Sequence, residues 1–177
     1  MDLHFPRIRN LPGIVSAYKH HQIPRTVLSI PHSGTRSLCE MLDCEHVHTF
    51  VPWSRIDAEI EDDVVITPLR DPKKLWQSWL NRFNTVHKID LDRFEGAWRN
   101  LELADKVYDI WYVPVDHPAR DERLQAIADR LEIEVNPTWE RVGHMGGDPE
   151  WVERNKDKLP VINWDYIYNL PFIKRLY

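Results

Sequence analysis

The segment that spans residues 31–37 has the composition of an anion-binding loop. Its members are Pro31, His32, Ser33, Gly34, Thr35, Arg36 and Ser37. The small residues at its centre let an anion approach the backbone closely, the hydroxyl groups can donate hydrogen bonds, and Arg36 supplies positive charge. The G-x-x-x-x-G-K-S/T spacing of nucleoside-triphosphate loops does not occur here. The loop therefore predicts a site for a phosphate-like anion, and an ordinary strand-to-helix turn is the alternative.

Arg70 and Ser78 form a second candidate set of anion ligands. Arg70 follows an apolar run and precedes Asp71 and Pro72, and a proline at that position suits the first turn of a helix. Ser78 lies eight residues after Arg70, so two helical turns bring both side chains toward one phosphate group. Arg70 would supply charge and Ser78 a hydroxyl donor. The alternative is a surface ion pair between Arg70 and Asp71.

The elements that must position these residues alternate between strands and helices. Short apolar runs predict strands at 26–30, 46–50, 64–69 and 109–115. Helical spacing of apolar residues predicts helices at 37–42, 73–83, 91–108 and 121–131. This alternation predicts an α/β fold with three layers (α/β/α), in which helices cover both faces of a central parallel sheet. Ligands of such sheets bind at the carboxyl ends of the strands, where both candidate sets lie.

The two sets together resemble the nucleotide-binding motifs of sulfotransferases that use 3′-phosphoadenosine 5′-phosphosulfate (PAPS). The segment 30–37 looks like the 5′-phosphosulfate loop of that family, and residues 34–42, GTRSLCEML, are similar to the GTRALLEML form of the carbohydrate sulfotransferases. The run Arg70–Pro72 with Ser78 resembles the family's 3′-phosphate motif, in which a serine follows the arginine by eight residues. A weaker likeness is the late strand with an acidic end at Asp116.

This resemblance covers about residues 25–133 and implies a small, divergent member of the P-loop sulfotransferase superfamily, with that family's topology. The implied enzyme transfers a sulfuryl group from PAPS, its co-substrate, to a hydroxyl or amine of an unknown small-molecule or carbohydrate acceptor. No metal is required for this chemistry. The residues implied for PAPS binding are His32, Ser33, Gly34, Thr35, Arg36, Ser37, Arg70, Ser78 and Arg141.

Two histidines are the candidate catalytic residues. His32 stands where the family has lysine or arginine beside the transferred group, and a protonated imidazole can neutralise charge on the departing oxygen. His48, near the end of the second predicted strand, is the candidate base for the acceptor hydroxyl. The alternatives to His48 as the base are His46, Asp57 and Glu59.

Other interpretations of the same residues stay open. Arg141 begins a glycine-rich run that resembles, imperfectly, the R-K-G-x-x-G-D-W loop of cytosolic sulfotransferases, and a surface turn is the alternative. A C-x4-C-x-H-x-H spacing that a zinc site could use is formed by Cys39, Cys44, His46 and His48, although buried free cysteines are more ordinary. The alternative functions are a phosphotransferase or nucleotide hydrolase of related P-loop architecture, and a non-catalytic nucleotide-binding module.

The composition limits the remaining choices. The chain has 177 residues, 42% of them hydrophobic, and so fits a single domain at 25–177 after an irregular arm at 1–24. Its formal net charge of −5 argues against nucleic-acid and anionic-membrane partners. Without an apolar run long enough for a membrane span or signal peptide, we expect a cytoplasmic protein. The short chain leaves little room for acceptor-binding insertions, so we expect a small acceptor, an open cleft, or a homodimer whose second subunit helps.

Overall fold

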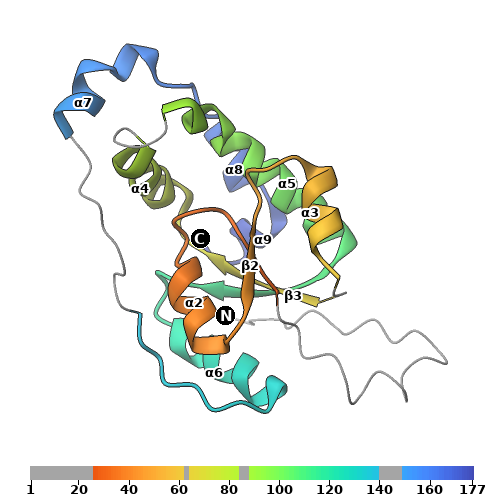
Figure 1. Cartoon of the computed structure of the whole chain (residues 1–177). Helices are drawn as coiled ribbons and strands as arrows, with labels where there is room; N and C mark the ends of the chain where they lie inside the picture. The colour runs from red at the N-terminus through yellow and green to blue at the C-terminus, as the bar shows by residue number, and fades with distance from the viewer. Residues whose placement is uncertain (1–25, 62–63, 84–87, 140–148) are drawn as a thin grey trace.

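The computed structural model describes residues 26–61, 64–83, 88–139 and 149–177 (Figure 1). Within these ranges the chain forms a parallel sheet of four strands in the order β2-β1-β3-β4. The strands are β1 (Thr26–Ser29), β2 (Glu45–His48), β3 (Val64–Leu69) and β4 (Asp109–Pro114). Each overlaps a predicted strand, so the α/β expectation is confirmed. The predicted arm at 1–24 and the candidate ligand Arg141 lie outside the described residues.

Helices connect the strands and form the C-terminal part of the chain. The α-helices are α2 (Thr35–Leu42), α3 (Trp53–Glu59), α4 (Pro72–Phe83), α5 (Phe94–Val107), α6 (Arg120–Leu131), α7 (Pro149–Arg154), α8 (Trp164–Tyr168) and α9 (Pro171–Lys174). The 3-10 helices are η1 (Lys88–Arg93) and η2 (Lys156–Lys158). The single helix predicted at 91–108 is wrong at its start, because the chain runs as the 3-10 helix η1 before α5 begins. None of the described helices is long and apolar enough to cross a bilayer.

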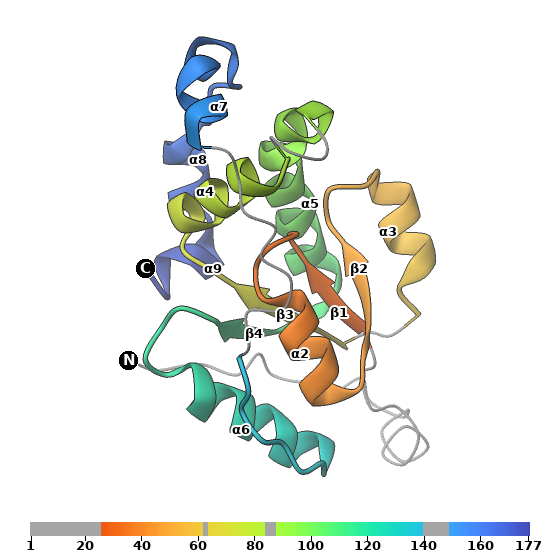
Figure 2. The ribbon, with the colours of Figure 1, turned by 60° about the vertical axis from the view of Figure 1, so that its left-hand side comes forward.

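Alternating side chains of the strands feed two separate hydrophobic clusters, one on each face of the sheet. Val27 points into the cluster that α2 and α6 cover, whereas its neighbour Leu28 points into the cluster shared with α4, α5, α8 and α9. Figure 2 shows α2 and α6 on one side of the sheet and the other four helices on the opposite side. The described residues therefore form three layers, with the sheet in the middle.

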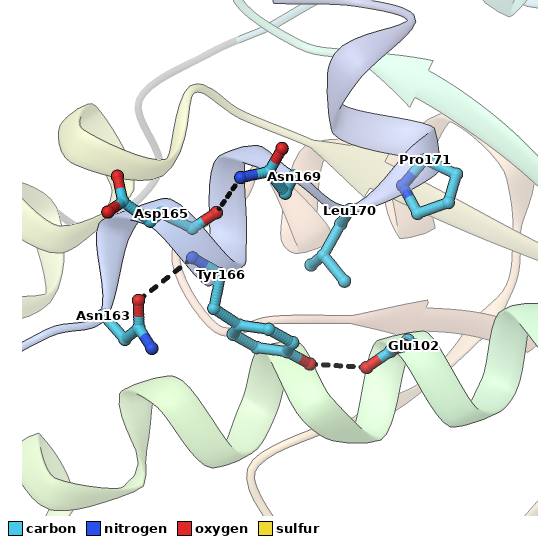
Figure 3. A pocket seen from close by; sticks show the side chains of 7 residues that line it. All are labelled: Glu102, Asn163, Asp165, Tyr166, Asn169, Leu170 and Pro171. Atoms are coloured by element: carbon cyan, nitrogen blue, oxygen red, sulfur yellow. Dashed lines mark hydrogen bonds between the residues drawn. The ribbon is translucent and has the colours of Figure 1, made fainter.

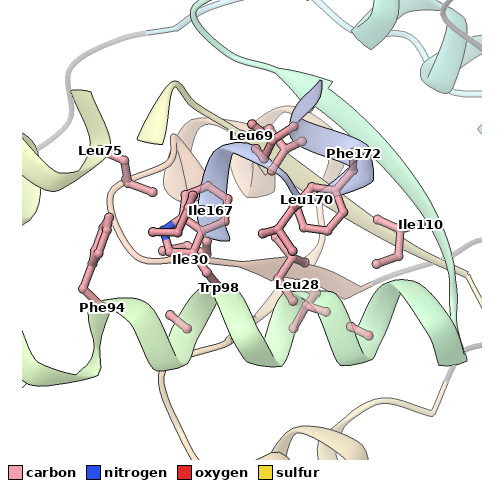
Figure 4. Close-up of a cluster of buried hydrophobic side chains, with 14 of the residues drawn as sticks. Leu28, Ile30, Leu69, Leu75, Phe94, Trp98, Ile110, Ile167, Leu170 and Phe172 are labelled. Atoms are coloured by element: carbon pink, nitrogen blue, oxygen red, sulfur yellow. The ribbon is translucent and has the colours of Figure 1, made fainter. Parts of the chain in front are cut away.

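The larger cluster is built around aromatic rings (Figure 4). Trp79 of α4 meets Phe94 of α5 edge-on, with 5.1 Å between the ring centroids, and both side chains are fully buried. Trp98 adds a third buried ring one helical turn later. Ile167 of α8 and Phe172 of α9 close the cluster. Full burial of such side chains contributes about 1.5–3 kcal/mol each, so the C-terminal helices are part of the core of the domain.

Candidate functional site

The order of the strands brings the two candidate loops together. β1 and β3 are neighbours in the sheet, and the helices that follow them, α2 and α4, pack on opposite faces. Two adjacent parallel strands whose connections leave in opposite directions mark the place where α/β proteins bind ligands. The connection after β1 is residues 30–34, called the β1 loop here, and the connection after β3 is residues 70–71, the β3 loop.

The β1 loop has an unusual backbone. His32 has a φ of 71° and Gly34 a φ of 96°, so both residues are in the left-handed region. At Gly34 a side chain would also meet an obstacle, since a Cβ atom there would lie 3.2 Å from both methyl carbons of Val115. Glycine is thus required at 34, whereas histidine at 32 adopts this conformation at a cost of about 1–2 kcal/mol. Strained backbone of this kind concentrates at ligand-binding sites.

Two hydroxyl groups, of Ser33 in the β1 loop and of Thr35 at the start of α2, face inward. Ser33 Oγ donates to the carbonyl of Ile30 at 2.7 Å, and Thr35 Oγ1 donates to Ser29 Oγ at 2.8 Å. The sequence predicted that these hydroxyl groups would donate to an anion, but in this state their protons are engaged within the protein. Both groups instead fix the shape of the loop around the site.

The N-terminus of α2 supplies the remaining donors. Gly34 is the N-cap residue of this helix and has no side chain to cap it, and the first intrahelical hydrogen bond runs from Leu38 N to Gly34 O at 3.1 Å. The backbone N–H groups of the first turn, residues 35–37, precede that bond. Arg36 is exposed at this turn. An uncapped helix N-terminus beside an arginine is favourable to an anion.

His48 is connected to the loop through Ser29, a residue that the sequence analysis did not single out. Ser29 Oγ lies 3.2 Å from His48 Nδ1 and is completely buried. Ser29 Oγ also accepts from Thr35 Oγ1, and the direction of its contact with His48 Nδ1 depends on which ring nitrogen of His48 carries the proton. Burial, together with His46, lowers the pKa of His48 to about 4, so this imidazole is neutral at pH 7. The signal available in the sequence was a serine within an otherwise apolar predicted strand, because such a serine needs a hydrogen-bond partner once it is buried.

Arg70 joins the β3 loop to the β1 loop. Its Nη1 donates to the carbonyl oxygen of His32 at 3.4 Å. The alternative ion pair between Arg70 and Asp71 does not form among the described residues. Asp71 instead accepts the backbone N–H groups of Lys73 and Lys74, each at 3.1 Å, and so caps α4.

The remaining candidate residues lie on the same two elements or farther away. Ser78 is partly exposed in the second turn of α4, and no hydrogen bond joins it to Arg70 in the part of the chain described. The ring of His32 lies 6.3 Å from that of Trp79 on α4. Two of the alternative bases are on α3, where Asp57 accepts from the hydroxyl of Tyr108 at 2.8 Å and Glu59 pairs with Arg55 at 2.6 Å. The third, His46, lies on β2 with its ring 4.7 Å from that of His48.

The zinc interpretation finds no support in the described residues. No group of three or more metal-ligating side chains is placed to hold an ion across residues 26–61, 64–83, 88–139 and 149–177. Burial raises the pKa of the Cys39 thiol to about 12, so the thiolate that zinc prefers is disfavoured.

A polar depression lies away from these loops, between α5 and the C-terminal helices (Figure 3). It has a volume of about 530 Å³, and three of the side chains that line it make hydrogen bonds within the protein. Tyr166 donates from its hydroxyl to Glu102 at 2.6 Å, and Asn163 Oδ1 accepts the backbone N–H of Tyr166 at 3.0 Å. Asn169 donates to the carbonyl of Asp165 at 2.6 Å. These contacts cap α8 and fasten it to α5, which is a structural role.

Comparison of the chain with family models, with curated proteins and with solved structures found no match in any of the three.

Proposed function

We propose that the protein is a cytoplasmic sulfotransferase of P-loop topology that uses PAPS as the sulfuryl donor. The hydrogen bond between Arg70 and the His32 carbonyl carries the proposal, because it unites the two motifs whose residues and spacing resemble the donor site of that family. The loop after β1 would hold the 5′-phosphosulfate with its backbone N–H groups and Arg36. Arg70 and Ser78 would hold the 3′-phosphate, with Arg141 as a further ligand.

The proposed reaction is an in-line displacement at sulfur. The acceptor oxygen or nitrogen forms a bond to sulfur while the bond from sulfur to the bridging oxygen of the 5′-phosphate breaks. The acceptor proton passes to a base, and 3′-phosphoadenosine 5′-phosphate (PAP) leaves with the bonding electron pair. Protonated His32 would neutralise charge on the departing oxygen, and catalysis would otherwise come from positioning.

His48 is the proposed base, and its contact with Ser29 defines how that role can be tested. A base needs a ring nitrogen without a proton. His48 meets this requirement in the tautomer in which Nδ1 carries the ring proton and donates to Ser29, because Nε2 is then free to accept the acceptor proton. His48→Asn retains a hydrogen-bond partner for Ser29 and removes the base. If His48 is the base, this substitution lowers kcat by about 10²–10⁴-fold and leaves PAP binding unchanged. An unchanged kcat would assign His48 to the support of Ser29 and Thr35 instead.

The donor site is tested by thermal unfolding with PAP, ATP and AMP. A ligand at 100 times its Kd adds about 2.7 kcal/mol to stability, which corresponds to a rise in Tm of about 5–11 °C for a chain of this size. We expect that rise with PAP, its loss in Arg70→Ala, and its retention in Arg55→Ala, which removes a matched arginine that pairs with Glu59 on α3. A rise with ATP instead of PAP would favour the phosphotransferase or hydrolase alternative.

Transfer is tested separately from binding, because a non-catalytic module would bind PAP without transferring sulfate. His32→Lys places the cation of the family motif beside the transferred group. We expect sulfate transfer from PAPS to a panel of hydroxyl and amine acceptors, including carbohydrates, to rise in this variant. Binding of PAP by both proteins without transfer by either would favour the non-catalytic module.

A further inference from the structure

Asp116 is attached directly to the backbone of the β3 loop. It follows β4 at the same edge of the sheet, and its two carboxylate oxygens lie 3.0 and 3.3 Å from the backbone nitrogen of Asp71, which donates to them. That N–H belongs to the peptide bond that follows Arg70. The side chain of Asp116 is only 15% exposed, with Lys74 Nζ 3.8 Å away. Asp116 therefore fixes the direction in which the chain leaves Arg70.

Two tyrosines of the C-terminal helical region hold the carboxylates on either side of this peptide. The hydroxyl of Tyr177 donates to Asp116, and the hydroxyl of Tyr168 donates to Asp71 at 3.1 Å. Burial raises the pKa of Tyr168 to about 12, and burial with the Asp116 contact raises the pKa of Tyr177 further. Both hydroxyl groups thus remain protonated donors at physiological pH. Asp71, Asp116, Tyr168 and Tyr177 are called the carboxylate–tyrosine cluster below.

The contacts of this cluster also reduce the electrostatic repulsion between its two carboxylates and a bound phosphate. Two carboxylates beside a phosphate site would repel the ligand, unless their charge is spread over hydrogen-bond donors and cations. Asp71 accepts from two helix N–H groups and a tyrosine, and Asp116 accepts from an N–H group and a tyrosine and faces Lys74. Arg70 is close enough to Tyr177 to act electrostatically on it. Among the described residues, the guanidinium of Arg70 contacts the His32 carbonyl and forms no ion pair with either carboxylate of the cluster.

We infer that Asp116 and Tyr177 are positioning residues that orient Arg70 for the 3′-phosphate. They thereby set the preference for a nucleotide that carries a 3′-phosphate, such as PAP, over one that carries only a 5′-phosphate, such as AMP. This inference rests on the proposed function. Neither residue contacts the nucleotide in this arrangement; both act through the Asp71 amide and the backbone of the β3 loop. Loss of one such hydrogen bond is expected to change selectivity by about 3- to 10-fold.

The test measures Kd for PAP and for AMP by titration calorimetry on the full chain and its variants. We expect wild type to prefer PAP, Arg70→Ala to abolish the preference, and Tyr177→Phe and Asp116→Asn to reduce it about 3- to 10-fold with Kd for AMP unchanged. Tyr108→Phe is the matched control, because Tyr108 makes the same kind of contact with Asp57 at 2.8 Å away from the β3 loop. The inference is overturned if Tyr177→Phe keeps the wild-type ratio while Arg70→Ala loses it.

A second measurement separates this inference from the proposed function and needs no nucleotide. Hydrogen exchange of the Asp71 amide reports directly on its bond to Asp116, and we expect it to be about 3- to 10-fold faster in Tyr177→Phe than in wild type and Tyr108→Phe. Unchanged exchange in Tyr177→Phe overturns the positioning role. If exchange is faster but wild type does not prefer PAP, then the positioning role stands, while the proposed donor and the selectivity claim fail.

Discussion

The β1 loop and the β3 loop meet at one edge of the sheet but are held there in different ways. In the β1 loop Ser33 contacts Ile30, and across the loop Thr35 of α2 contacts Ser29 of β1, so the partners are three and six residues apart. In the β3 loop, Asp71 is held by Asp116 and Tyr168, 45 and 97 residues away. The hydroxyl contacts at the first loop are therefore local in sequence, with Arg70 as a distant partner at the His32 carbonyl. The carboxylate of Asp71 in the second loop combines its local cap of α4 with partners that only the completed fold supplies.

The largest effect is expected where the β1 loop packs against Val115, the residue that follows β4. Gly34→Ala places a Cβ atom on a left-handed residue and 3.2 Å from both methyl carbons of Val115, so the variant should lose about 2–4 kcal/mol of unfolding free energy. Urea denaturation measures this loss. Gly96→Ala is the control, because no atom outside the adjacent backbone of α5 lies within 4 Å of the new methyl group, and it should gain about 0.5–1 kcal/mol. Equal effects at both glycines would contradict the proposed constraint on the β1 loop.

Buried His48, which contacts Ser29 beneath the β1 loop, makes the unfolding free energy depend on pH in the acid range. Its pKa is about 4 in the folded protein, below the ordinary value of 6.5, so between these values the unfolded chain binds a proton that the folded one does not. Stability should therefore fall as the pH drops from 6.5 toward 4, by up to about 3 kcal/mol. His48→Asn, which does not titrate, should show a shallower fall in urea denaturation at pH 7 and pH 5. Parallel curves for the two proteins would rule out this linkage.

A smaller effect is expected from the cap of α4 in the β3 loop. Asp71→Ala leaves the N–H groups of Lys73 and Lys74 without their carboxylate acceptor, which should cost about 0.5–2 kcal/mol. Thermal unfolding measures the loss. Asp71→Asn is the matched variant, since asparagine also caps helices, and most of the stability should return. Failure of asparagine to restore stability would shift the explanation from the cap to the contact with Tyr168.

The smallest effect is expected at His32 and has the opposite sign. His32→Gly removes the cost of a side chain at a φ of 71° and should raise unfolding free energy by about 1 kcal/mol, less the entropy that glycine adds to the unfolded chain. Under the proposed function the same variant should lose sulfate transfer. Calorimetry and a transfer assay separate the two results. A less stable variant would show that the imidazole contributes more through packing beside Trp79 than its backbone costs.

The strands were predictable because each is a short apolar run, and the helices after β1, β3 and β4 because their apolar residues recur at helical spacing. α8 and α9 were not predicted, because helices this short cannot show a period. Their buried residues, among them Ile167 and Phe172, are inserted into the core by tertiary packing.

The same distinction applies to the candidate site. The β1 loop and Arg70 are visible as local patterns of residue types. The partners of Asp71 are not, because Asp116, Tyr168 and Tyr177 are brought to it only when the sheet and the C-terminal helices assemble. Ser29 was overlooked for a related reason, since its role appears only when β2 places His48 beside it.

The left-handed residues and inward hydroxyl groups of the β1 loop also affect the thermodynamics of association. A loop that already holds its shape loses little conformational entropy when an anion enters, so more of the interaction energy appears as affinity. Under the proposed function, residues 30–34 would act as such a preorganised site for the 5′-phosphosulfate. Rearrangement of their backbone would then not be the step that limits the rate of ligand capture.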